Sequence, residues 1–271
     1  MTETATMTES QPFTSDLLKG KKGLVLGVAN KRSIAWGISQ ALANHGAQLA
    51  FTYQGERLKD SVEQLTATLP HPAPLYACDV TNDEDIQTVF KKLDEDFGSI
   101  QFLIHCIAFA KKEELTGRTV DTSRDGFHLA MDVSAYSLLA LTKAAEPLLE
   151  KEGGSVVALT YLGSEKVIPN YNVMGLAKAG LESGIRYLAS DLGKKNIRVN
   201  GVSAGPVSTL AARGISGFTT MLESHRGRAA LGRNVEIAEV ANTALFLASP
   251  LSSGITGEIL YVDCGYRIMG A

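Results

Sequence analysis

Residues 23–53 read GLVLGVANKRSIAWGISQALANHGAQLAFTY, and this stretch decides the fold. Its first five residues are a short apolar run that ends in Gly27, as a buried strand would. Ser33 stands at the N-cap position of a helix, because apolar residues follow it at helical spacing over 34–42. Residues 47–53 form a second apolar run. The stretch therefore predicts a strand, a helix and a second strand in succession.

The same alternation continues to the end of the chain. Further strands are expected at 75–80, 101–107, 155–160, 197–202 and 259–263, and helices at 56–69, 83–97, 127–150 and 171–192, with one or two more ending near Leu247. This order predicts a parallel sheet with helices on both faces. We expect one doubly wound, Rossmann-type α/β domain over residues 18–271. Residues 1–17 are expected to be a disordered tail, since they lack the basic start and apolar run of a secretory signal.

The composition is that of an ordinary globular protein, with 45% hydrophobic and 20% charged residues. A formal net charge of −3 provides no basic surface for nucleic acid, and no apolar run approaches the roughly 20 residues of a membrane span. The three cysteines lie far apart without a CxxC pair, which favours reduced thiols and a cytoplasmic location. The five histidines lack metal-ligand spacing, so no metal site is predicted.

The turn after the first strand is a candidate nucleotide site, because ligands of such sheets bind beyond the carboxyl ends of the strands. It is not the GxGxxG fingerprint, since Gly27 is its only glycine before the helix. Gly27 lets the backbone leave the strand sharply, and the N–H groups near Ser33 and Ile34 can bind a pyrophosphate. The alternative is a capped helix after a tight turn.

The end of the second strand is where an acidic, ribose-binding residue is expected, and the chain has Gln54 there. An arginine would favour a 2′-phosphate, so Gln54 favours NADH over NADPH, although Arg57 lies one turn further on. Asp79 and Val80, at the end of the third strand, could flank the adenine or simply cap a helix.

Two tyrosines and a lysine follow the strand at 155–160. Tyr161 ends that strand, and Tyr171 opens the next helix. Lys178 lies seven residues beyond Tyr171, so both side chains share a helix face, about 10.5 Å apart along the axis. We therefore expect both tyrosines at the ligand-binding edge of the sheet. The alternative is that they only pack there.

This segment resembles the enoyl-acyl-carrier-protein reductases of bacterial fatty-acid synthesis, a divergent branch of the short-chain dehydrogenase/reductase superfamily. The similarity runs from about residue 18 to residue 269, and it is carried by the strings GVANKRSIAWGI, TYLGSEKVIPNYNVMGLAK, SAGPVSTLAA and SSGITGEILYVD. The commoner superfamily pattern is Tyr-x3-Lys with a serine thirteen residues before the tyrosine. Gly175 and Ala158 occupy those positions here, which argues against an ordinary ketone or alcohol enzyme.

The resemblance implies NADH-dependent reduction of the trans-2 double bond of an enoyl thioester on acyl carrier protein, in a homotetramer. It implies that Tyr161, Tyr171 and Lys178 are catalytic, that Lys178 also holds the nicotinamide ribose, and that Ala110 lies near the acyl substrate. The other residues implied to line the dinucleotide are Gly27, Ser33, Ile34, Gln54, Asp79, Val80, Ile107, Val207, Ser208, Thr209, Leu210 and Ala211.

The chemistry of these side chains agrees with that reaction. Hydride addition to the β-carbon leaves negative charge on the thioester oxygen, and a phenol O–H aimed at it stabilises the enolate. We assign Tyr171 as this donor and Tyr161 as a supporting or proton-donating residue, and leave open which of them delivers the proton. The ammonium of Lys178 is expected to favour tyrosinate character and to bind ribose.

Residues 209–218 are small, apolar and glycine-bearing, which predicts a lid over cofactor and acyl chain, or else a plain surface loop. The helix at 171–192 is apolar or small on most sides, which predicts contact with another subunit. Two other functions remain open: a carbonyl reductase of the same superfamily, and a nucleotide-binding regulator without catalysis.

Overall fold

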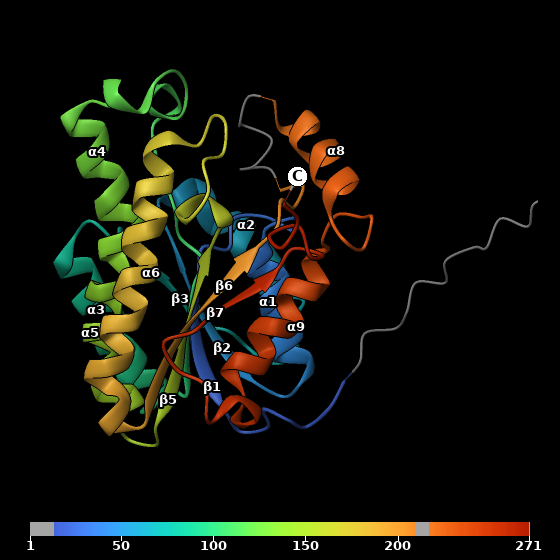
Figure 1. The fold of residues 1–271 in the computed structure, drawn as a ribbon. Coiled ribbons are helices and arrows are strands. Elements are labelled where there is room, and N and C mark those ends of the chain that lie inside the picture. The colour runs from blue at the N-terminus through green and yellow to red at the C-terminus, as the bar shows by residue number, and fades with distance from the viewer. Residues whose placement is uncertain (1–13, 210–216, 271) are drawn as a thin grey trace, which may run out of the picture.

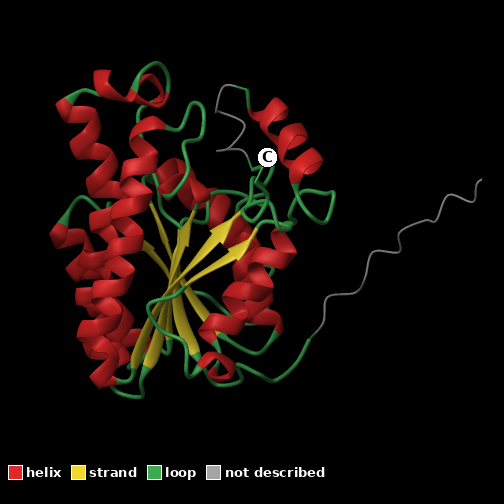
Figure 2. Ribbon diagram, viewed as in Figure 1, coloured by secondary structure: helices red, strands yellow, loops and turns green. Residues whose placement is uncertain are grey.

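A single parallel sheet forms the centre of the protein in the computed structural model, which describes residues 14–209 and 217–270. Within these residues the sheet has seven strands in the order β3-β2-β1-β4-β5-β6-β7, and every neighbouring pair is parallel (Figure 2). The strands are β1 (Lys22–Leu26), β2 (Gln48–Tyr53), β3 (Leu75–Ala77), β4 (Phe102–His105), β5 (Gly154–Thr160), β6 (Ile197–Ala204) and β7 (Ile259–Val262). The predicted doubly wound fold is confirmed.

Helices cover both faces of the sheet (Figure 1). They are α1 (Ile34–Asn44), α2 (Glu56–Thr66), α3 (Asp83–Phe97), α4 (Arg124–Met131), α5 (Ser137–Leu149), α6 (Asn172–Leu192), α8 (Phe218–Arg228) and α9 (Ile237–Ala248). Buried side chains of α1, α2 and α9 share one core cluster, and those of α3, α5 and α6 share the other. No helix of the described residues is long and apolar enough to cross a membrane.

The strand order reverses at β1, which lies between β2 and β4. The chain builds outward from β1 to β3, then returns to the other side of β1 and builds outward again to β7. A crevice opens at such a reversal, beyond the carboxyl ends of the strands. The loops that follow β1 and β4 therefore lie where a ligand of this fold is expected.

The start of α1 follows the local sequence signal. The hydroxyl of Ser33 accepts a hydrogen bond from the backbone N–H of Trp36 at 3.2 Å, as an N-cap serine should. Gly27, at the end of β1, has a φ of 97°. A Cβ atom there would lie 2.1 Å from the carbonyl oxygen of Cys106, so only glycine lets the turn pass this close to the end of β4.

A helix runs over the expected region, from residue 124 to residue 149, but a π-helical turn over Asp132–Tyr136, which was not expected, divides it into α4 and α5. Ser134 in the turn and Ser137 at the start of α5 contact the loop after β4 and the end of β4. The Ser134 hydroxyl accepts from the backbone N–H of Phe109 at 2.9 Å, and the Ser137 hydroxyl lies 2.8 Å from Nε2 of His105. A π turn of this kind changes the helical register and is frequent at functional sites.

Candidate active site

Tyr161 and Tyr171 meet at the carboxyl end of β5. Tyr161 follows the strand directly, and Tyr171 is the residue before the first turn of α6. Their rings pack edge to face, with centroids 5.1 Å apart and planes at 72°. A Cβ atom on Gly163 would lie 2.5 Å from the Tyr171 ring, so the glycine makes room for this pair. The structure thus brings together two residues that the sequence separates by nine others, residues 162–170.

Both phenols hold their protons firmly. Burial, with a smaller contribution from Tyr266, raises the pKa of Tyr161 to about 12. Burial also raises the pKa of Tyr171, with smaller contributions from Tyr161 and Glu182. The expected tyrosinate character is therefore wrong for this structure, because desolvation of the phenolate outweighs any attraction to Lys178. Protonated phenols suit hydrogen-bond donation to an oxyanion.

Lys178 is a buried ammonium on α6, with 5% of its surface exposed. Its Nζ donates to the carbonyl oxygen of Leu159 at 2.7 Å, which fixes the amine against β5. Burial lowers the pKa of Lys178 to about 8, and Cys106 and Glu182 oppose this shift. An ammonium has three N–H donors, of which the carbonyl takes one. The remaining donors are suited to vicinal hydroxyls such as those of a ribose.

The predicted adenosine end of the site lies beyond β2 and β3. Nε2 of Gln54 donates to Oδ2 of Asp79 at 3.1 Å. The backbone N–H and hydroxyl of Thr81 both donate to Oδ1 of the same carboxylate. The backbone bond from Thr81 is the main reason that the pKa of Asp79 is lowered. Asp79 therefore stays ionised and holds the Gln54 amide in place.

The other predicted cofactor residues follow the same sheet edge where the structure describes them. Gly27 follows β1, Ser33 caps α1 and Ile34 begins it, Val80 lies after β3, and Ile107 follows β4. Ala110, the predicted acyl contact, lies three residues beyond Ile107. Past β6 the chain continues through Val207, Ser208 and Thr209, and the N–H of Thr209 donates to the carbonyl of Val207 at 2.7 Å. Leu210, Ala211 and most of the predicted lid at 209–218 fall outside the described residues.

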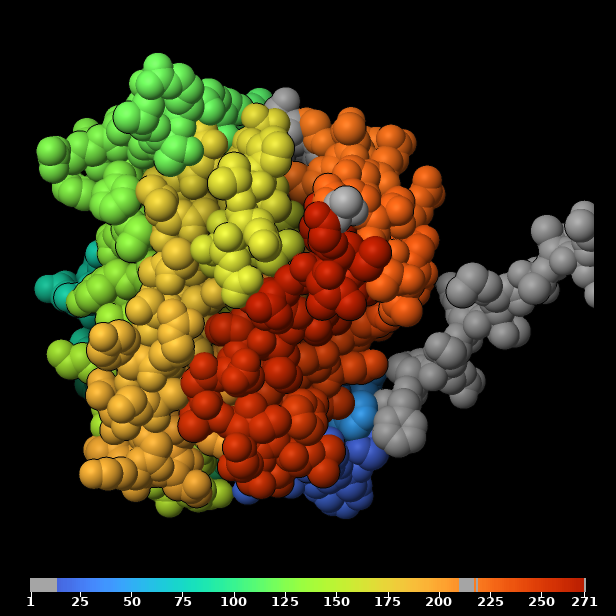
Figure 3. All heavy atoms as spheres, in the orientation of Figure 1, coloured from blue at the N-terminus to red at the C-terminus, as the bar shows by residue number. Residues whose placement is uncertain are grey.

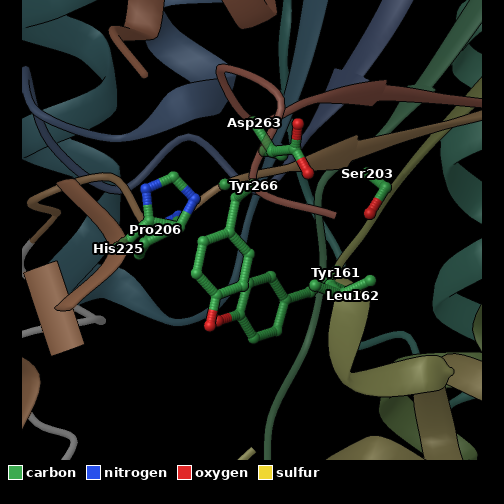
Figure 4. A pocket seen from close by; sticks show the side chains of 9 residues that line it. Tyr161, Leu162, Ser203, Pro206, His225, Asp263 and Tyr266 are labelled. Carbon is green, nitrogen blue, oxygen red and sulfur yellow. The ribbon is translucent and has the colours of Figure 1, made fainter. Parts of the chain in front are cut away.

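Sequence reasoning missed a group of residues that meet Tyr161 from α8 and from the C-terminal segment. The phenol of Tyr161 donates to Sδ of Met221 at 3.7 Å. A small pocket lies alongside; its lining is Tyr161, Leu162, Ser203, Ala204, Gly205, Pro206, His225, Asp263 and Tyr266 (Figure 4). No local pattern could reveal these neighbours, because they come from elements that meet only in the folded chain.

The parallel sheet with a capped helix after β1, and a tyrosine and lysine on the helix after β5, define a short-chain dehydrogenase/reductase. A family model described as enoyl-(acyl carrier protein) reductase matches residues 27–267. The enoyl-[acyl-carrier-protein] reductase [NADH] FabI of Bacillus subtilis (strain 168) is 55% identical, over 93% of this chain and 97% of that protein. The chain belongs to the enoyl-acyl-carrier-protein reductase family, as the sequence motifs predicted.

Solved structures agree with this assignment. The Bacillus cereus enoyl-acyl carrier protein reductase, in complex with NADP+ and indole naphthyridinone, superposes with a TM-score of 0.92 at 50% identity, over 94% of this chain and 99% of that one. The Anaplasma phagocytophilum enzyme in complex with NAD gives a TM-score of 0.92 at 46% identity, over 97% and 99%.

Proposed function

We infer that the protein is an NADH-dependent oxidoreductase that reduces the trans-2 double bond of an enoyl thioester carried by acyl carrier protein. Its place in fatty-acid elongation follows from the family to which it belongs. The observation that carries the inference is the pair of protonated phenols, Tyr161 and Tyr171, packed together at the end of β5, the strand to which the buried amine of Lys178 is bonded at Leu159.

The residues along the sheet edge fit a dinucleotide. The first turn of α1 leaves backbone N–H groups without intrahelical partners, and these suit a pyrophosphate. The Gln54–Asp79 pair offers fixed polar groups at the adenosine end. Lys178 is buried with N–H donors to spare, which suits the nicotinamide ribose. When bound, the reduced nicotinamide supplies the hydride.

The chain's own residues would then stabilise the negative charge on the thioester oxygen and supply the proton that is added at the α-carbon. Tyr171 donates its O–H to the thioester oxygen as negative charge develops there, which stabilises the enolate. Tyr161 packs edge to face with that ring and provides a second O–H at the carboxyl end of β5. The ammonium of Lys178, held by the Leu159 carbonyl, orients the ribose hydroxyls and adds positive charge. Either tyrosine can give the proton that completes the reduction at the α-carbon.

One assay tests this function against both alternatives. NADH absorbance is followed with crotonyl-coenzyme A and, separately, with a 3-oxoacyl thioester. We expect NADH consumption with crotonyl-coenzyme A only. Consumption with the 3-oxoacyl thioester only would indicate a carbonyl reductase, and consumption with neither would indicate a nucleotide-binding regulator.

The cofactor preference is proposed to depend on Gln54. The neutral amide, held against the Asp79 carboxylate, offers no positive charge to a 2′-phosphate. Replacing Gln54→Arg should raise the NADPH-to-NADH ratio of kcat/KM by about tenfold or more, since a charge-assisted hydrogen bond contributes about 1.5–3 kcal/mol. Gln54→Glu is the matched control and should keep the NADH preference. If the NADPH-to-NADH ratio of kcat/KM were unchanged in Gln54→Arg, the 2′-position of the adenosine ribose would not lie beside residue 54.

We propose that the protein is a homotetramer that uses the outer face of α6. In Figure 3 the yellow to gold side chains of α6 form an uncovered surface beside the red C-terminal residues. Large apolar side chains are exposed on α6, at Leu176 and Tyr187, and on the segment that packs against it, at Tyr136 and Leu139. Leu139 packs beside Gly184, so the two elements are adjacent. Exposed apolar patches of this kind mark interaction sites.

A charge placed in this face should break the assembly. We expect Tyr187→Glu to lower the molar mass in light scattering at micromolar concentration, because the carboxylate would be buried without a partner. Val120→Glu, at an equally exposed apolar residue elsewhere, should leave the mass unchanged. A wild-type protein with the mass of a single chain would refute the tetramer. We also propose a cytoplasmic location, because all three cysteines are free thiols.

A further inference from the structure

The buried face of α6 carries two opposite charges. Among the residues that the structure describes, Lys178 is the only buried lysine or arginine, and Glu182 is the only buried glutamate. Glu182 lies four residues beyond Lys178, so the two side chains share one face of the helix, one turn apart. Lys178 has a role at the ribose, whereas no step of the proposed reaction uses Glu182. A buried carboxylate is costly unless a charge or hydrogen bonds compensate it, so its presence needs a reason.

Both charged groups bind the end of β5. The Thr160 hydroxyl donates to Oε1 of Glu182 at 2.6 Å. Nζ of Lys178 donates to the carbonyl oxygen of Leu159 at 2.7 Å. Leu159 and Thr160 are consecutive residues, and Tyr161 follows them directly. The carboxylate therefore ties α6 to the strand one residue from the point where the amine is bound.

The hydrogen bond between Thr160 and Glu182 has the length expected for an ionised carboxylate. Bonds from a hydroxyl to a carboxylate ion measure about 2.5–2.7 Å, shorter than those between neutral groups. Both partners are buried, Thr160 with 4% and Glu182 with 5% of its surface exposed. Buried charges are screened far less than exposed ones. The negative charge therefore acts on the ammonium one helical turn away.

The other titratable groups that face Lys178 in the described part of the chain come from β4 and the residue after it. Burial lowers the pKa of His105 to about 3 and raises that of the Cys106 thiol to about 12, so both are uncharged where the pKa of the amine lies, at about 8. The carboxylate itself faces two phenols, Tyr171 and Tyr261, whose pKa burial also raises. Among these groups the carboxylate alone carries a charge that can compensate the ammonium.

We propose that Glu182 is a positioning residue for Lys178: its carboxylate is the buried counter-charge that keeps the amine protonated, and its bond to Thr160 holds α6 where the amine reaches β5. This assignment rests on the proposed function, in which the Lys178 ammonium binds the nicotinamide ribose. The carboxylate exchanges no proton with cofactor or substrate. It acts on NADH binding only through the ammonium.

The variant Glu182→Gln removes the charge and keeps an oxygen that can accept from the Thr160 hydroxyl. NADH affinity, measured by fluorescence titration from pH 6 to 10, should fall at a pH about one unit lower than in the wild type, because a nearby negative charge raises the pKa of an amine. At pH 6 the two proteins should bind NADH equally, since the amine is protonated in both. Glu95→Gln, at an exposed glutamate of α3, is the matched control and should follow the wild-type curve.

A purely structural role of Glu182 predicts a different result. NADH binding would then be weakened at every pH, without any displacement of the curve along the pH axis. That outcome would overturn the proposal, and so would a Glu182→Gln curve identical with that of the wild type.

A stability cycle with Lys178→Met provides a second test that needs neither cofactor nor substrate. The free energy of unfolding in urea is measured at pH 7 for the wild type, both single variants and the double variant. The double variant lacks both buried charges, so it should be more stable than the sum of the two single changes predicts. If Glu182→Gln alone does not fold, the double variant should fold. Single changes that add, or a double variant that also fails to fold, would overturn the pairing.

The cycle separates this proposal from the proposed function. If Lys178→Met bound NADH as tightly as the wild type, the role of the amine at the ribose would be wrong. The unfolding free energies would still decide whether Glu182 compensates the charge of Lys178.

Discussion

Replacing Tyr171 with phenylalanine is expected to lower kcat for crotonyl-coenzyme A by about 10²–10³-fold, the usual loss when one oxyanion donor is removed. The phenol is held at the start of α6 against the ring of Tyr161, and burial keeps it protonated. It is therefore a preorganised donor whose contribution appears only when charge develops on the thioester oxygen. The KM for NADH should change little, because the cofactor residues are untouched. Steady-state kinetics by NADH absorbance measures both constants.

The ring of Tyr171 remains in this variant, so its packing over Gly163 and against Tyr161 is preserved. We accordingly expect the same Tm as wild type. Tyr76→Phe serves as the control, because it removes a phenol that donates to Asp96 at the far edge of the sheet. Wild-type turnover in Tyr171→Phe would refute its role as the oxyanion donor. A large loss in Tyr161→Phe with none in Tyr171→Phe would instead exchange the two assignments.

The sequence predicts best those features that a local pattern dictates. The capping serine of α1 and the bounds of α3, Asp83–Phe97, follow from side chains within a few residues of each other. The end of β3 is less well predicted: the strand stops at Ala77, and the backbone N–H of Asp79 donates to the carboxylate of Asp85 instead of the sheet. A side chain six residues away competes there with the apolar run.

Features that depend on distant parts of the chain could not be predicted. The π turn at Asp132–Tyr136 is accompanied by bonds to the loop after β4, which helical periodicity does not reveal. Tyr266 and His225 meet Tyr161 only through the packing of α8 and the C-terminal segment. The expected tyrosinate character is wrong for a related reason. Charge proximity can be read from spacing, but desolvation depends on everything that surrounds the phenol.

The ammonium of Lys178 is expected to favour cofactor binding, whereas its burial lowers the stability of the fold. Replacing Lys178 should separate these two effects. Lys178→Met keeps the length of an unbranched side chain and removes the ammonium. We expect a weakening of NADH binding and a fall in kcat/KM of about a hundredfold or more, because the ribose loses its charged donor and the site loses its positive charge. Fluorescence titration with NADH measures the binding, and circular dichroism confirms the fold. Lys194→Met, at an exposed lysine in the turn after α6, is the control.

The free energy of unfolding of the wild type should rise with pH relative to that of the same variant. The pKa of Lys178 is lowered from 10.5 to about 8 in the folded protein, so the folded state binds fewer protons than the unfolded chain between these values. The free energy of unfolding of the wild type therefore rises by up to ~3 kcal/mol as pH rises through this window. Below pH 8 the amine is charged, and the fold is less stable by that amount because the charge is buried. Lys178→Met has no such group. Urea unfolding of both proteins at pH 7, 8, 9 and 10 should show the wild type gaining relative to the variant. If the free energies of unfolding of the two proteins changed in parallel with pH, the amine would not be desolvated. The proposal that a buried ammonium binds the ribose would then be wrong.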